Sequence, residues 1–405
     1  MIRPSRFASL LLCLLTLGLL MAPGSANAVE VAAAGDISCP ADSTRQHAVE
    51  PGEPEPAPGA AKCQGRRVAN MIQSQSPDIS LALGDLIQGQ TSYAHAYSDF
   101  GLAWGGLGSR LAASVGNHDY HRNESGTLTA SGYFHYWESR EAPVWSYGKP
   151  GKGWSSWNTG DWHMVNLNSN CNAADCTFTG PQLRWLVKDL RANLKSGETK
   201  CTLAYFHHPL FSSGVPRGRS ADDSLVENLW EVLYRFRTDL VLTGHQHFYE
   251  RYFPQDPSGR RDETGITQII TGTGGASTFR PDGKEGVVAT NSAFSIRRLG
   301  ATFLDLENGS YSSHFRDMLG GIHDPAPAAK CLKPGAGHDE RVPRVKKYRA
   351  HMERMADLDK RVKKLDRRLS ALRKDGASDT KIESVYRVRR AVMTTRERVR
   401  VARLY

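Results

Sequence analysis

Between residues 29 and 243, short apolar runs alternate with segments in which apolar residues recur every three or four positions. The runs have the length and composition of buried strands. They are Val29–Ala34, Ile79–Leu83, Ala112–Val115, His163–Leu167, Thr202–Phe206 and Leu240–Thr243. The helical pattern occupies Arg66–Gln75, Pro181–Leu194 and Leu225–Phe236. Strands that alternate with helices predict an α/β fold with sheets at its centre.

The pattern changes after residue 265, where strand-like runs follow one another directly. These runs are Ile266–Thr271, Ser295–Arg298, Ala301–Leu306 and Tyr311–Phe315. Asn308-Gly309 separates the last two and favours a tight hairpin turn, so we expect these two strands to pair in a second sheet. Two stretches rich in proline predict irregular segments. Residues 50–61 are expected to form a surface insertion, and Asp324–Gly337 a linker that closes the main domain.

The C-terminal segment has a separate pattern of its own. Its apolar residues repeat at alternating spacings of four and three, at Leu358, Val362, Leu365, Leu369 and Leu372. Asp375-Gly376 interrupts this seam, and a second helical stretch follows Ser378, which predicts an antiparallel helical hairpin. Because the seam is short, folding back and dimerisation both remain open. The predicted organisation is a main domain over residues 29–323, a linker over 324–340 and a helical tail over 341–405.

Charge is divided unevenly between these parts. The formal net charge is +10, yet residues 341–405 hold 22 Lys and Arg against 8 Asp and Glu, whereas the rest holds 30 against 34. The tail is therefore basic and the main domain mildly acidic. Such a tail could bind anionic envelope polymers or lipid headgroups by charge alone, or be a solvated appendage. No pattern indicates sequence-specific recognition of nucleic acid.

The N-terminus predicts a secretory leader over residues 1–28. Arg3 and Arg6 precede an apolar run over residues 7–22, and Ala26-Asn27-Ala28 ends it in the small-residue pattern of a cleavage site. An uncleaved anchor is the alternative, although the run is shorter than the ~20 residues that span a bilayer. We therefore expect an exported or envelope-associated protein without a transmembrane segment after cleavage.

Cysteine usage agrees with an exported protein. Cleavage of the leader would remove Cys13 and leave an even number of cysteines, which predicts disulfides. A zinc–thiolate site is disfavoured because no C-x₂-C pair is present. Proximity along the chain suggests the pairs Cys39–Cys63 and Cys171–Cys176, which leaves Cys201 with Cys331.

Five strand-like runs end in residue types that bind metal ions. Their ends read Gly35-Asp36, Gly84-Asp85, Gly116-Asn117-His118-Asp119, His207-His208-Pro209 and Gly244-His245-Gln246-His247. Open α/β sheets place ligand sites at the carboxyl ends of their strands, so these side chains are expected to converge. Oxygen and imidazole donors together suit Zn, Fe or Mn.

This ordered set resembles the calcineurin-like metallophosphoesterases, and among them the purple acid phosphatase-like branch, over residues 29–320. The resemblance implies a four-layer αββα sandwich of two mixed β-sheets with helices outside, and two metal ions bridged by a carboxylate. By the same resemblance, Asp36 and His247 bind the first metal and Asp85 bridges both. The second metal is then bound by Asn117, His207 and His245.

The resemblance also places His118 toward the substrate. There His118 could protonate the leaving group or neutralise phosphoryl oxygens, with Asp119 as the partner that orients it. His208 is interpreted as a contact to phosphate or to a metal ligand, or else as a surface histidine. In the loop that follows, Arg217 and Arg219 are candidates for a phosphate clamp or for a solvated basic loop.

Two positions depart from the family pattern at the first metal. Ser38 stands where the general family has the histidine of an Asp-x-His motif. Gln88 stands where purple acid phosphatases have a tyrosine, three residues after the bridging aspartate. Gln88, a water molecule or Tyr93 could complete this site. Without a tyrosinate ligand the protein is expected to be colourless, and the two metals could be Fe, Zn or Mn.

These observations favour an exported binuclear-metal phosphoester hydrolase. The leading prediction is an acid phosphatase-like phosphomonoesterase that uses a metal-bound hydroxide for in-line attack. Its substrate would be a phosphorylated small molecule or a phosphoester polymer. The alternatives are a phosphodiesterase or nucleotidase on the same scaffold, and a weakened hydrolase that binds anionic polymers in the cell envelope.

Overall fold

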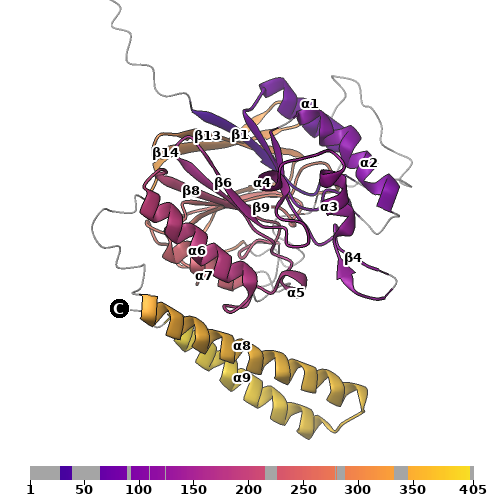
Figure 1. Cartoon of the computed structure of the whole chain (residues 1–405), viewed down its shortest axis with the longest axis vertical. Helices are drawn as coiled ribbons and strands as arrows, with labels where there is room; N and C mark the ends of the chain where they lie inside the picture. Colours follow the sequence, from indigo (N-terminus) through magenta and orange to yellow (C-terminus); the bar gives the residue numbers. More distant parts are fainter. Residues whose placement is uncertain are drawn as a thin grey trace, which may run out of the picture.

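Two β-sheets lie face to face at the centre of the molecule, with helices on both outer sides (Figure 1). The computed structural model describes residues 28–38, 64–88, 93–108, 110–123, 125–214, 226–278, 280, 288–332 and 345–401. Residues 1–27 of the predicted leader over residues 1–28, the insertion over residues 50–61 and the pair Cys39–Cys63 lie outside this part.

The first sheet has six strands in the order β15-β14-β13-β1-β2-β3. The strands are β1 (Val29–Ala34), β2 (Ile79–Leu83), β3 (Leu111–Ser114), β13 (Gly300–Glu307), β14 (Ser310–Asp317) and β15 (Ile322–Lys330). Strands β1, β2 and β3 are parallel, and β13 pairs antiparallel with the free edge of β1.

Two predictions about this sheet are wrong in part. β13 and β14 pair as expected, but they extend the sheet of β1 and do not form a second one, because β1 offers them an open edge. The expected linker is a strand over residues 324–330. Pro325 and Pro327 are tolerated there because β15 is an edge strand, where a missing N–H need not break the ladder. Residues 333–340 lie outside the described part, and the division into domains stays a prediction.

The second sheet has seven strands in the order β12-β10-β11-β9-β8-β7-β6. They are β6 (Ser155–Thr159), β7 (Trp162–Asn166), β8 (Cys201–Tyr205), β9 (Leu240–Thr243), β10 (Tyr249–Tyr252), β11 (Thr267–Thr271) and β12 (Ser292–Ile296). Its central strands β7, β8, β9 and β11 are parallel. A short ribbon joins β4 (His121–Arg122) to β5 (Leu128–Thr129).

The central strands of each sheet are buried on both faces. Val31, Leu81, Leu203 and Leu242 fill the space between the sheets. The outer face of the first sheet is covered by α1 (Gly65–Gln75), α2 (Tyr93–Trp104) and α3 (Ser131–Glu138). The outer face of the second is covered by α6 (Pro181–Ser196) and α7 (Val226–Arg235). Short helical turns complete the domain at η1 (Gly105–Leu107), α4 (Val144–Tyr147) and α5 (Cys171–Ala174). The predicted four-layer sandwich is confirmed.

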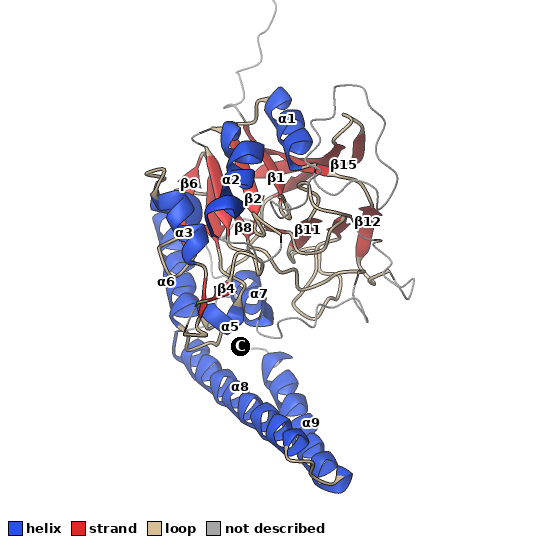
Figure 2. Ribbon diagram, turned by 90° about the vertical axis from the view of Figure 1, so that its right-hand side faces the viewer, coloured by secondary structure: helices blue, strands red, loops and turns tan. Residues whose placement is uncertain are grey.

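The C-terminal segment folds back on itself, as one of the two sequence alternatives predicted. Helices α8 (Val345–Lys374) and α9 (Asp379–Val401) form a hairpin that projects from the domain (Figure 2). Among the helices that the structure describes, none combines the length and apolar character needed to span a bilayer.

Two of the three predicted disulfides are present. Cys171 and Cys176 close a small loop after β7, and Cys201 pairs with Cys331. The second bond joins the start of β8 to the residue that follows β15, so it links the two sheets covalently. Disulfides agree with an extracytoplasmic protein.

Candidate metal centre

The predicted metal ligands come together where the carboxyl ends of parallel strands from both sheets meet. Asp36 follows β1, Asp85 follows β2 and Asn117 follows β3 in the first sheet, while His207 follows β8 and His245 follows β9 in the second. The site therefore spans the two sheets, as strand-end reasoning predicts for open α/β sheets.

The backbone at these strand ends is held in uncommon conformations. Asp36, Asp85 and His245 have φ values of 59°, 49° and 69°, in the left-handed region that non-glycine residues rarely adopt. Gly116 shows why glycine precedes Asn117: a Cβ there would lie 2.1 Å from the backbone nitrogen of Asp85. Strain of this kind persists where surrounding contacts enforce it, which is common at functional sites.

Each of the two central carboxylates has one oxygen fixed by a backbone N–H. The amide of His245 donates to Oδ2 of Asp36 at 2.7 Å, and the amide of His118 donates to Oδ1 of Asp85 at 2.8 Å. The other oxygens, Oδ1 of Asp36 and Oδ2 of Asp85, face the side chains of the site. Asp85 therefore presents a single oxygen to both groups of donors described below.

The first group of donors surrounds Oδ1 of Asp36. Nε2 of His247 lies 3.1 Å from this oxygen, and the imidazole is fixed from behind by the backbone oxygen of Ser277. The side-chain amide of Gln88 lies 3.3 Å from Oδ1 of Asp36 and 3.3 Å from Oδ2 of Asp85. Gln88 therefore reaches both carboxylates of the expected first site. The side chain of Tyr93, the other candidate, lies outside the described part.

The donor atoms of the second group lie close to one another. Oδ1 of Asn117 lies 3.0 Å from both Nε2 of His207 and Nδ1 of His245, and the two imidazole nitrogens are 3.3 Å apart. Nε2 of His207 is also 3.3 Å from Oδ2 of Asp85. The other nitrogen of His207 is fixed by the backbone oxygen of Leu83 at 2.9 Å, so that Nε2 is directed to the site.

The pKa shifts of these groups show that the carboxylates of the site favour positive charge beside them. Burial alone would raise the pKa of Asp85, but the charges of His207 and His118 hold that pKa well below its usual value. Burial alone would lower the pKa of His207, yet Asp85 raises it. Asp36 likewise raises the pKa of His247 against the effect of burial. A metal cation could replace these imidazolium protons, because metal binding releases protons from its ligands. The donors present thus fit two metal ions that share Asp85.

His118 stands at the accessible side of this centre. Its imidazole is 41% exposed, and Nε2 lies 3.9 Å from Oδ2 of Asp85. Asp119 is buried, and its carboxylate accepts hydrogen bonds from the amides of Gly116 and Leu86 and from the hydroxyl of Tyr97. Burial, and then the charge of Asp85, raise the pKa of Asp119 to about 7. These bonds tie the loop of Asp85 to the loop of Asn117, while orientation of His118 by Asp119 stays a prediction.

His208 is buried, so the alternative of a surface histidine is wrong. Its ring packs against those of His207 and His245, with centroids 4.9 and 4.6 Å away. The hydroxyl of Ser169 lies 2.8 Å from Nδ1 of His208 and accepts the backbone N–H of His208 at 2.9 Å. The loop closed by Cys171 and Cys176 starts two residues later. Burial, and then the charges of His207 and His245, lower the pKa of His208.

Sequence reasoning missed Ser169. The signal was available, because the polar run Asn168-Ser169-Asn170 begins two residues after the end of β7, at the same edge of the sheet as the predicted ligands. Arg217 and Arg219 lie outside the described part, so the proposed phosphate clamp stays a prediction.

Comparison with known proteins agrees with this geometry. Residues 31–249 match the family model of the calcineurin-like phosphoesterases. Purple acid phosphatase 15 of Arabidopsis thaliana is 29% identical over 239 residues, which cover 51% of this chain and 42% of that protein. Acid phosphatase type 7 of Homo sapiens is 25% identical over 180 residues, covering 39% and 41% of the two chains.

Among solved structures, a purple acid phosphatase from yellow lupin (Lupinus luteus) seeds shares the fold. Its TM-score is 0.57 at 18% identity, and the match covers 75% of this chain and 54% of that one. The matches to these curated relatives cover less than half of their length. The family model nevertheless spans more than half of this chain and includes every strand end of the site. The chain therefore belongs to the calcineurin-like phosphoesterase family, and purple acid phosphatases are among the proteins to which it is similar.

Proposed function

We propose that this protein is an exported, binuclear-metal phosphoester hydrolase that acts on phosphomonoesters. The observation that carries the proposal is the position of Oδ2 of Asp85, which lies 3.3 Å from His207 of one donor group and 3.3 Å from Gln88 of the other. One buried carboxylate oxygen shared by two sets of nitrogen and oxygen donors is the arrangement that a pair of metal ions requires.

In this proposal the second metal is held by Asn117, His207 and His245. The first is held by Asp36 and His247, and Gln88 takes the remaining position through its amide oxygen. Nitrogen and oxygen of a side-chain amide are interchanged by a half-turn, so the observed position of the amide suits ligation as well as hydrogen bonding. A neutral amide provides less negative charge than a tyrosinate, which favours divalent Fe, Zn or Mn in the first site.

Two metal ions, when bound, neutralise phosphoryl charge and provide a nucleophile at neutral pH. The chain's own residues then bind and orient the ester. The exposed imidazole of His118 is placed to donate a proton to the leaving oxygen or a hydrogen bond to the phosphoryl group. His208, fixed by Ser169, fills the wall beside His207 and His245 and keeps bulk water from these ligands.

Similarity to acid phosphatases favours a monoester substrate over a diester or a nucleotide. The convergence of the donors favours a hydrolase over an envelope-binding protein with a lost site. Export rests on the predicted leader and on the disulfides.

Hydrolysis of p-nitrophenyl phosphate and of bis(p-nitrophenyl) phosphate tests this function. The purified protein is assayed after addition of Mn, Zn or Fe, with Asp85→Ala as the control. We expect faster turnover of the monoester and none in the control. Faster turnover of the diester would assign the phosphodiesterase alternative, and no turnover with any metal would refute the hydrolase.

A further inference from the structure

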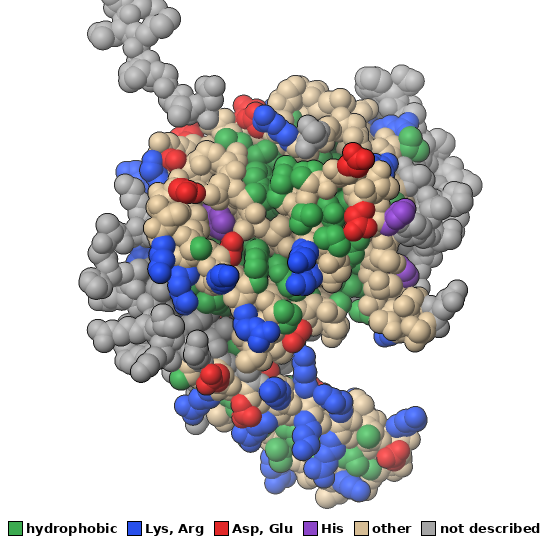
Figure 3. Space-filling view, in the orientation of Figure 1, with side chains coloured by type: hydrophobic (Ala, Val, Ile, Leu, Met, Phe, Trp, Pro, Cys, Tyr) green, Lys and Arg blue, Asp and Glu red, His purple; other side chains and the backbone are tan. Residues whose placement is uncertain are grey.

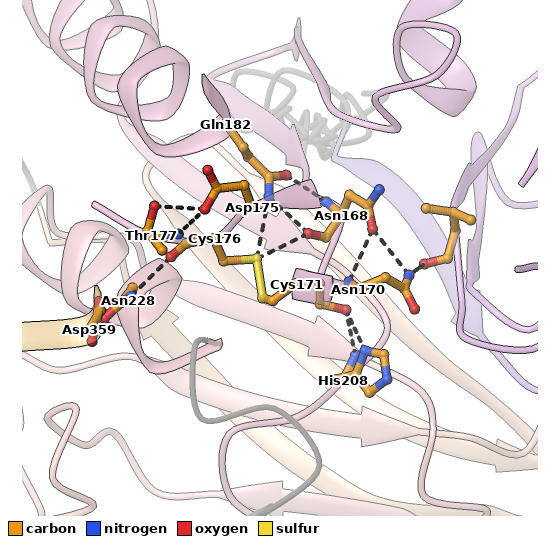
Figure 4. The surroundings of a disulfide bond; sticks show 12 residues. Asn168, Asn170, Cys171, Asp175, Cys176, Thr177, Gln182, His208, Asn228 and Asp359 are labelled. Atoms are coloured by element: carbon orange, nitrogen blue, oxygen red, sulfur yellow. Dashed lines mark hydrogen bonds between the residues drawn. A yellow bond between two sulfur atoms is a disulfide. The ribbon is translucent and has the colours of Figure 1, made fainter. Parts of the chain in front are cut away.

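The base of the C-terminal hairpin is fixed to the catalytic domain by a buried cluster of charges. Nε of Arg396 on α9 lies 2.8 Å from Asp359 on α8, and its other nitrogens reach Glu227 at 3.3 Å and Asn228 at 3.0 Å on α7. Asn228 in turn donates to Asp359 and to the backbone oxygen of Cys176 (Figure 4). All four side chains of the cluster are buried.

Apolar contacts reinforce this attachment. Met355, Leu358, Val392 and Val399 belong to the same buried cluster as the core side chains of α6 and α7. Farther out, the two helices have a small core of their own, built on Leu369, Leu372 and Val385. The outer half of the hairpin is thus a helical arm with a fixed attachment to the domain.

The side of α8 that faces away from this seam carries only positive charge over its outer half. Seven exposed cations lie there within about 160° of the helix circumference and along about 21 Å of its axis. They are Lys360, Arg361, Lys363, Lys364, Arg367, Arg368 and Lys374. Asp366 lies on another side of α8, where it pairs with Arg389 of α9. Between residues 360 and 374, whose side chains are all described, no carboxylate lies on the cationic side. Figure 3 shows Lys and Arg gathered on the hairpin.

We propose that this side of α8, residues 360–374, binds a linear polymer of phosphate or phosphodiester groups. A row of cations along a fixed helix is complementary to a row of anionic groups along an extended polymer. The binding energy of such a contact comes from release of counterions. The proposal concerns binding alone and does not depend on the hydrolase.

The same surface is poorly suited to a membrane. Amphipathic helices that enter the bilayer interface present large apolar side chains beside their basic ones. In the described part of the hairpin, Val388 on α9 is the one large apolar side chain that is largely exposed.

Fluorescence anisotropy with labelled long-chain polyphosphate tests the proposal on the full-length protein, over a series of salt concentrations. A free-phosphate assay in parallel verifies that the probe stays intact. The test variant replaces Lys360, Lys364, Arg367 and Lys374 with Gln, which has a similar helix propensity. The control variant replaces four exposed lysines outside the hairpin with Gln. These are Lys149, Lys188, Lys195 and Lys330.

We expect the control to bind much as the wild type does. In the test variant, loss of four contacts should lower the slope of log affinity against log salt by about 3, and affinity near 0.1 M salt by roughly 10²–10³-fold. Equal binding by the two variants would overturn the proposal. So would binding to anionic lipid vesicles without binding to polyphosphate, because that result would assign the surface to a membrane. Unchanged helicity by circular dichroism shows that the hairpin is intact in the test variant.

Discussion

Replacement of Arg396 by Met should release the hairpin from the domain. Methionine keeps the aliphatic packing of the arginine stem but removes the guanidinium that pairs with the buried carboxylate of Asp359 and also reaches Glu227. Their side chains are 3% and 9% exposed beside an Arg396 that is 6% exposed. Removal of one partner from a buried ion pair costs about 3–5 kcal/mol, because the remaining charge is not compensated.

The chain offers a matched control in the same two helices. Arg389 pairs with Asp366 at 2.6 Å, but these side chains are 33% and 47% exposed. A pair so accessible to water contributes only about 0.2–1 kcal/mol. Arg389→Met should therefore leave the hairpin in place, although it removes the same charge from the same helix.

Native-state proteolysis of the hairpin measures the difference, since cleavage follows the population of the open form when opening is fast. A cost of about 3–5 kcal/mol raises that population by roughly 10²–10⁴-fold for Arg396→Met. Addition of Asp359→Asn should restore part of the resistance, because it removes the buried negative charge that Arg396 neutralises in the wild type. Equal cleavage of the Arg396 and Arg389 variants would refute the assignment of the buried cluster as the attachment.

Three other predictions concern the metal centre and the core. His118→Ala should retain its metals, as measured by elemental analysis, but lose about 10²–10⁴-fold in turnover; full activity would exclude the assigned role. Gln88→Tyr should give a coloured protein when loaded with iron, and an uncoloured iron-loaded variant would exclude position 88 as a ligand position. Burial raises the pKa of Asp239 to about 7. Above about pH 4 the folded state therefore keeps a proton that the unfolded state has lost. The free energy of unfolding should decrease as the pH rises from about 4 to about 7. Asp239→Asn should make the free energy of unfolding, measured with urea, depend less on pH in this range. An unchanged dependence on pH would contradict the raised pKa.

Local patterns were sufficient for most of the elements and for candidate ligands that the structure brings together. The strands β1, β2 and β9 begin and end where the apolar runs do, because buried strands are short and mostly apolar. The glycine-containing ends of these strands pointed to side chains that do lie together, because ligand sites in open α/β sheets collect at one edge. The same rule, applied to β7, would also have included Ser169.

Features that depend on distant segments could not be predicted in the same way. No local sequence pattern shows that β13 pairs with β1, because the two strands lie near opposite ends of the domain's sequence. The position of Gln88 became clear only from its distances to Asp36 and Asp85, since Asp36 lies 52 residues away. The attachment of the hairpin depends on Arg396 and Glu227, which are 169 residues apart. The sequence pattern therefore predicted the hairpin but not where it packs.

The number of metal ions per chain tests the central claim most directly. The purified mature protein and Asp85→Ala are each loaded with Mn, Zn or Fe, dialysed and analysed for metal, together with turnover of p-nitrophenyl phosphate. The account predicts about two ions per chain with turnover in the wild type, and loss of both metal retention and turnover in Asp85→Ala. Full turnover with one ion or none, or an Asp85→Ala variant that keeps two ions and full turnover, would contradict it.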